Sequence, residues 1–210
     1  MPDFSWTDLK GKTVLGGRKG GMPEMVFEYI LKKNGLDPEK DLSIDQSIDF
    51  GATAAAFTGD DSADFTDRIW SRLLLALEKQ GAGYVVASLG VDSGYVPYTS
   101  YSARTSYMEK NPDIMQKFTD ALQKGMDFVQ SHTPEEIAEI IEPQFPETDL
   151  DTITAIVKRY YDQDTWKENL IFEKESFELL QDILEDAGEL SRRMPYEKLV
   201  TVEYAEKAAE

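Results

Sequence analysis

Residues 12–35 read KTVLGGRKGGMPEMVFEYILKKNG. We predict a short strand at residues 12–15, a glycine cluster at residues 16–21, and then a helix. A Pro-Glu pair opens this helix, because proline at the first helical position and an acid in the first turn are both start signals. An Asn-Gly pair ends it as a C-terminal cap. A strand joined to a helix in this way predicts an α/β layer.

The rest of the first hundred residues continues the alternation of strands and helices. The predicted elements are strands at residues 42–48 and 83–90, and helices at residues 50–57 and 67–79. The strand at residues 83–90, GYVVASLG, is an apolar run bounded by glycines. The helix at residues 67–79 has an apolar stripe that includes Ile69 and Leu77. This order of elements predicts an α/β fold with a short, mostly parallel sheet.

Beyond about residue 104 the pattern becomes helical, after an extended segment at residues 96–103. Four helices are predicted, at residues 111–131, from residue 133, at residues 149–162 and at residues 173–187. The second of them begins with a capping box, TPEE. We therefore expect an α/β lobe at residues 1–104, which holds the glycine cluster and a returning strand, and a helical segment at residues 105–210.

The charge balance and the apolar pattern exclude some partners. The chain has 40 Asp and Glu against 22 Lys and Arg, a formal net charge of −18. This charge repels a phosphate backbone, and the basic residues form only isolated pairs, so we expect no nucleic-acid partner. The sequence has no apolar run that predicts a membrane helix. Its first twelve residues do not resemble a signal peptide, so we expect no export signal within this sequence.

Few residues offer catalytic chemistry. The sequence has no cysteine, which excludes a disulfide framework and a thiol nucleophile. The single histidine, His132, lies at a helix end, where its charge suits the helix dipole. The acidic residues 60–64 could attract a cation, although a solvated loop is the favoured interpretation. We therefore predict no enzyme, no cofactor and no metal site.

The glycine cluster is the best candidate binding site. Glycines let backbone amides approach a ligand, and the start of a helix offers unpaired N–H groups and a positive dipole. Arg18 and Lys19 add positive charge beside Gly20 and Gly21. These four residues suit a carboxylate, a phosphate, a sulfonate or another polar group, although the pattern is not a Walker loop. A tight turn with two surface bases explains the spacing equally well.

A second group of candidates lies at the end of the predicted strand 83–90. Ser88 lies in that strand, and Ser93 and Tyr98 follow it in the sequence SGYVPYT. Loops at the carboxyl ends of strands bind ligands in open α/β sheets. Tyrosine offers a ligand an apolar face and a polar tip. We predict that Ser88, Ser93 and Tyr98 assist ligand binding.

Several longer stretches together resemble one protein family. They are LKGKTVLGGRKGGMPEMVFEYILKKNGL, GYVVASLG, SGYVPYTSY, NPDIMQKFTDALQKGMDFVQSHTPEEIA and FPETDLDTI. In this order they resemble the second lobe of the periplasmic solute-binding proteins of the nitrate, sulfonate, taurine and thiamine-precursor group, which is called NMT1/THI5-like. The resemblance covers nearly the whole chain. One stretch departs from it: where relatives tend to have an aromatic-Glu-Pro strand, residues 64–72 read DFTDRIWSR and predict a helix.

The resemblance implies a function as well as a fold. Such proteins have a type II two-lobed fold and close on a small polar or anionic ligand, such as a sulfonate, nitrate or a thiamine precursor, in an interlobe cleft. They work in the periplasm or as extracellular lipoproteins, and they deliver the ligand to the permease subunits of an ABC importer without catalysis. A small enzyme related to pyrimidine-precursor synthases is disfavoured, because the chain has one histidine and no cysteine.

The resemblance also implies that an N-terminal portion of the family fold is missing from this sequence. The helices after residue 104 would then lack the sheet that they cover in relatives. The alternative to ligand binding is therefore a non-catalytic fragment that self-associates, as a possible homodimer, through these helical faces.

Overall fold

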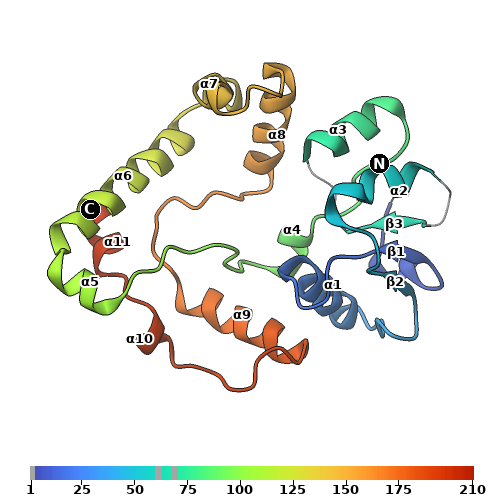
Figure 1. The fold of residues 1–210 in the computed structure, drawn as a ribbon, viewed down its shortest axis with the longest axis horizontal. Coiled ribbons are helices and arrows are strands. Elements are labelled where there is room, and N and C mark those ends of the chain that lie inside the picture. Colours follow the sequence, from blue (N-terminus) through green and yellow to red (C-terminus); the bar gives the residue numbers. More distant parts are fainter. Residues whose placement is uncertain (1–2, 60–62, 68–70) are drawn as a thin grey trace. The chain divides into compact units, whose positions relative to one another are not determined.

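A computed structural model describes residues 3–59, 63–67 and 71–210 of the chain (Figure 1). The chain forms two compact units. The first is Met1–Tyr95 with Gln181–Ser191, and the second is Val96–Leu180 with Arg192–Glu210. The helix α9 (Lys174–Asp186) therefore contributes residues to both units.

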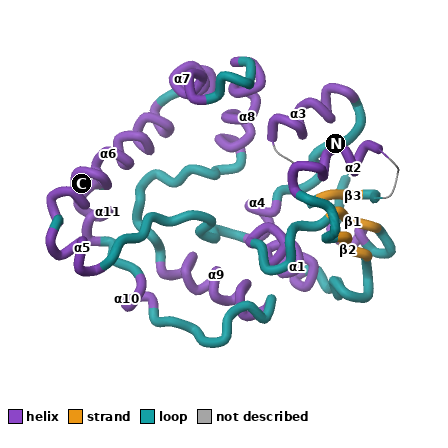
Figure 2. The backbone as a smooth tube through the Cα atoms, in the orientation of Figure 1, coloured by secondary structure: helices purple, strands orange, loops and turns teal. Residues whose placement is uncertain are grey.

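The first unit contains a sheet of three short parallel strands. β1 (Thr13–Leu15) lies between β2 (Ser43–Asp45) and β3 (Phe65–Thr66), as Figure 2 shows. In the register of this sheet, Val14 lies opposite both Ile44 and Phe65. The α/β fold with a short parallel sheet, predicted from the sequence, is confirmed.

The helix α1 (Met22–Lys33) forms where the sequence predicts it. It has a proline in its first turn, and Gly35 follows it with a φ of +77°, a left-handed conformation that favours glycine. Phe27 and Leu31 on its apolar face join Val14 of β1 in one buried cluster. This shared core fixes the strand, the glycine loop and the helix as one structural element.

The remaining elements of the first unit are short. They are η1 (Trp6–Leu9), η2 (Phe50–Ala52), α2 (Thr53–Gly59), α3 (Ser71–Gln80) and α4 (Leu89–Ser93). The helices predicted at residues 50–57 and 67–79 correspond to α2 and α3 with shifted bounds. Ile69 of the predicted stripe and residues 60–62 of the predicted acidic loop lie outside the described residues.

The helix predicted across residues 64–72 is wrong in its first part, which contains β3. The backbone N–H of Asp64 donates to the carbonyl of Thr13 at 2.9 Å, and its carboxylate accepts from the N–H of Thr13 at 2.9 Å. After the strand, the N–H of Asp67 donates to the carbonyl of Leu15 at 3.2 Å. A helix would leave these ladder bonds unmade, so long-range pairing with β1 overrides the local helical pattern.

The strand predicted at residues 83–90 is also wrong. Residues 83–88 form no strand, and α4 begins at Leu89, with the Ser88 Oγ accepting from the N–H of Val91 at 3.4 Å. The apolar residues 83–88 cannot pair with the central strand β1, because β2 and β3 already occupy both of its edges. The returning strand predicted at residues 96–103 is absent too, and the described second unit contains no strand with which it could pair.

The second unit is helical. Beside the first part of α9, it consists of α5 (Thr105–Lys110), α6 (Pro112–Ser131), α7 (Pro134–Ile141), η3 (Glu142–Gln144), α8 (Leu150–Asp162), α10 (Tyr196–Leu199) and α11 (Glu203–Ala208). The predicted capping box is present, since Thr133 and Glu136 exchange hydrogen bonds of 2.9 and 3.3 Å. α7 packs on α8 through Ile137, Ala138 and Ile153. Within the described residues, every helix is too short or too polar to cross a lipid bilayer.

The buried face of α1 should carry much of the stability of the first unit. Leu31 is fully buried, so Leu31→Ala should lower the free energy of unfolding by about 2–5 kcal/mol. Val91, which is 58% exposed on α4, serves as the control, and Val91→Ala should cost about 0.5 kcal/mol or less. Urea unfolding followed by circular dichroism measures both variants. Equal losses in the two variants would contradict the assigned core.

Candidate functional site

The loop at residues 16–21 connects β1 to α1, and its backbone leaves no room for larger residues. A Cβ at Gly16 would lie 2.3 Å from the Cγ2 of Ile44, and a Cβ at Gly21 would lie 2.8 Å from the carbonyl oxygen of Arg18. Gly20 has a φ of +71°, which side chains rarely adopt. Three of the four glycines, Gly16, Gly20 and Gly21, are therefore required by the path of the backbone.

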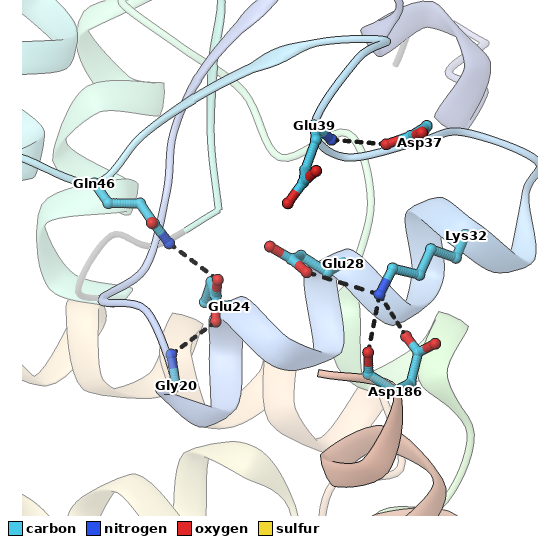
Figure 3. A network of polar contacts seen from close by, with 8 residues as sticks. All are labelled: Gly20, Glu24, Glu28, Lys32, Asp37, Glu39, Gln46 and Asp186. Carbon is cyan, nitrogen blue, oxygen red and sulfur yellow. Dashed lines mark hydrogen bonds and ion pairs between the residues drawn. The ribbon is translucent and has the colours of Figure 1, made fainter. Parts of the chain in front are cut away.

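Two carboxylates hold this loop from inside the protein. The N–H of Gly17 donates to the Oδ2 of Asp67 at 3.0 Å. The N–H of Gly20 donates to the Oε2 of Glu24 at 3.0 Å, and the Nε2 of Gln46 donates to the Oε1 of Glu24 at 3.0 Å (Figure 3). The Nε2 of Gln46 also donates to the carbonyl of Gly17 at 3.0 Å. The loop, the start of α1 and the segment after β2 thus form one hydrogen-bonded network.

Sequence reasoning used Glu24 only as a helix-start signal and missed its role in the loop. Glu24 is buried, with 3% of its surface exposed. It is the third residue of α1, the position from which a glutamate reaches back to a free N–H in a capping box. That spacing could have identified Glu24. Gln46 and Asp67 carried no such local signal, because their places depend on the pairing of β2 and β3 with β1.

A second glutamate lies one turn further along α1. Burial raises the pKa of Glu28 above its ordinary value of 4.5, and repulsion from Glu24 adds to the effect. The Nζ of Lys32 lies 3.9 Å from the Glu28 carboxylate and 2.9 Å from that of Asp186 (Figure 3). The inner side of α1 is therefore acidic, and Lys32 balances it only in part.

The predicted site residues fall into different surroundings. Arg18 and Lys19 are exposed in the loop beside Gly20 and Gly21, so chain continuity brings these four together. The Ser88 hydroxyl caps α4. The predicted residues Ser93 and Tyr98 lie elsewhere. Ser93 is 3% exposed and donates to the carbonyls of Gly90 and Gly94, whereas Tyr98 is 73% exposed and belongs to the second unit.

An apolar cavity of about 500 Å³ lies in the first unit, on the β3 side of β1. Trp6, Phe57, Phe65 and Tyr84 are among its aromatic lining residues. Asp67 also lines it, so the residue that holds the Gly17 amide is shared between the loop and the cavity. Sequence reasoning did not foresee this cavity.

His132 has a structural environment at the end of α6. Its ring stacks on Phe128 with 3.7 Å between centroids, and its Nδ1 lies 2.8 Å from the carbonyl oxygen of Phe128. In the part of the chain that the structure describes, no three His, Cys, Asp or Glu side chains gather as a metal site. No described residue group thus stands out as a candidate for metal binding.

The raised pKa of Glu28 predicts a pH-dependent stability. As the pH rises above 4.5, the Glu28 carboxyl loses its proton in the unfolded chain before it does so in the folded chain. The contribution of Glu28 to the free energy of unfolding therefore falls. Glu28→Gln should therefore gain stability relative to the wild type between pH 4 and pH 7, as measured by urea unfolding. Glu139→Gln, on the exposed surface of α7, controls for the loss of charge alone. A difference that shrinks as the pH rises would contradict the assignment.

Comparison with known proteins identifies the family. The family described as NMT1/THI5 like matches residues 4–137. A protein of Bacillus subtilis (strain 168) named "Putative binding protein YtlA" is 42% identical over 204 residues, which are 97% of this chain. The chain spans 60% of the length of that relative. The chain therefore belongs to the NMT1/THI5-like family of binding proteins.

Proposed function

We propose that the chain binds a small polar organic solute at the loop of residues 16–21, as the glycine-loop lobe of a solute-binding protein. The observation that supports this is the loop itself, because packing requires Gly16 and Gly21 and a left-handed φ favours Gly20. The loop thereby places backbone groups beside Arg18 and Lys19 at the start of α1. The family supports binding in place of catalysis.

Delivery of the solute to the permease subunits of an ABC importer belongs to the same proposal. So does a location in the periplasm or on the outer side of the cell membrane. The basis for both is membership of the NMT1/THI5-like family and the similarity to a relative named as a binding protein. Ser88, Ser93 and Tyr98 are the secondary candidates for contacts with the solute.

A ligand screen by thermal shift, followed by calorimetry on the compounds that bind, tests the loop. The double change Arg18→Ala and Lys19→Ala should weaken the binding of a solute found in this way by about 1–3 kcal/mol, which is about 5- to 150-fold, because charge-assisted hydrogen bonds are lost. Lys117→Ala with Lys124→Ala, both exposed on α6, removes the same charge elsewhere and should leave the affinity unchanged. Unchanged affinity in the loop variant would refute this site.

A second candidate function is self-association through α6. Ile114 and Phe118 lie one turn apart on this helix and are 53% and 44% exposed. Tyr101, which is 76% exposed, lies edge-on to the ring of Phe118 at 5.0 Å. Such a patch is typical of a surface that a partner covers, and a second copy of the chain offers the same patch.

Sedimentation velocity tests the homodimer. The wild-type chain should sediment as a dimer at high concentration, because pairing two such patches removes apolar surface from water. Ile114→Ser with Phe118→Ser should shift it to a monomer of 23.7 kDa. Lys117→Ser on the same helix is the control, and it should remain dimeric. A wild-type chain that stays monomeric would rule out this interface.

A further inference from the structure

The amides of the four glycines in the loop are already occupied by acceptors within the protein. Gly17 and Gly20 donate to the carboxylates of Asp67 and Glu24, both at 3.0 Å. Gly16 and Gly21 donate to the carbonyls of Asp45 and Arg18, both at 2.8 Å. Two of the four acceptors carry a negative charge, and they stand where the oxygens of a bound anion would stand.

The electrostatics below the loop oppose a second negative charge. Glu24 is 3% exposed at the N-terminal end of α1, so it offsets the positive end of the helix dipole in poorly solvated surroundings. Glu28 follows one turn later, and burial and repulsion from Glu24 raise its pKa. Arg18 and Lys19 attract anions, but both are exposed to water, which weakens their pull.

We propose that Glu24 and Asp67 fill the anion positions of the glycine loop from within, so that the loop rejects anionic solutes and accepts a neutral polar solute with both donor and acceptor groups. This inference rests on the proposed function and deepens it by assigning the charge of the solute. An uncharged amide or similar group can accept from Arg18 or Lys19 and donate to backbone carbonyls. It brings no charge that the two carboxylates repel.

Glu24 acts in this proposal as a positioning residue. It fixes the amide of Gly20, it accepts from Gln46, and its field extends into the loop. A purely structural role would predict that the loss of Glu24 weakens the binding of all solutes alike. A role in charge selection predicts instead that its loss changes the preference between a charged solute and a neutral one.

Acetamide and acetate form the probe pair, because they have nearly the same size and shape and differ by one charge. Titrations of the ¹⁵N-labelled chain at pH 7 and constant ionic strength follow the amide signals of Gly17 and Gly20. In the wild type, acetamide should bind more tightly than acetate. Glu24→Gln should raise the affinity for acetate about tenfold and change that for acetamide about twofold or less. Glu39→Gln, an equal charge change at an exposed position, should leave the preference unchanged.

Three results would overturn the inference, and they differ in what they say about the proposed function. Tighter wild-type binding of acetate leaves loop binding intact and refutes only the charge selection. If Glu24→Gln weakens the binding of acetamide and of acetate equally, the role of Glu24 is purely structural. Loop amides that respond to neither probe refute the proposed site, and this inference with it. If Glu24→Gln fails to fold, the same two titrations are made on Asp67→Asn. The preference between acetamide and acetate in that variant and in the wild type then decides whether the inference holds.

Discussion

The buried carboxylate of Glu24 is the interaction on which the glycine loop depends. It accepts from the amide of Gly20 on one side and from the side chain of Gln46 on the other. Gln46 in turn donates to the carbonyl of Gly17. One side chain therefore joins the turn that leaves β1, the helix that follows it and the segment that leaves β2. Without this carboxylate, the N–H of Gly20 would have no acceptor, and the side-chain amide of Gln46 would lose one of its two acceptors.

Burying this charge in a chain of net charge −18 requires compensation. An unpaired carboxylate in an apolar interior costs several kcal/mol, and charge-assisted hydrogen bonds together with the N-terminus of a helix offset much of that cost. The loop supplies the first and α1 supplies the second. Burial raises the pKa of the neighbouring Glu28, and repulsion from Glu24 adds to the effect. The position of Lys32 between Glu28 and Asp186 relieves part of it.

Local signals predicted the local parts of the fold. β1, α1 and the capping box of α7 follow from glycines, prolines and first-turn acids, whose effects extend over a few residues. Residues 64–67 and 83–90 were predicted wrongly because a strand needs a partner edge, and a single strand's sequence does not specify which edges are occupied. For the same reason, the contacts of Gln46 and Asp67 with the loop could not be predicted from the sequence. The residues named from the sequence, Arg18 to Gly21 with Ser88, Ser93 and Tyr98, remain predictions for ligand binding.

The first unit is discontinuous in the sequence, and this sets the order in which it can be completed during synthesis. Lys32 bonds to Asp186, 154 positions further along the chain, and a Cβ at Gly20 would lie 3.0 Å from the carboxylate of Glu189. At roughly 5–20 residues per second, a ribosome makes the intervening chain in about 8–30 s. During that time the nascent sheet and α1 exist without the closing segment of Gln181–Ser191. The unit therefore becomes complete only after nearly the whole chain has been made.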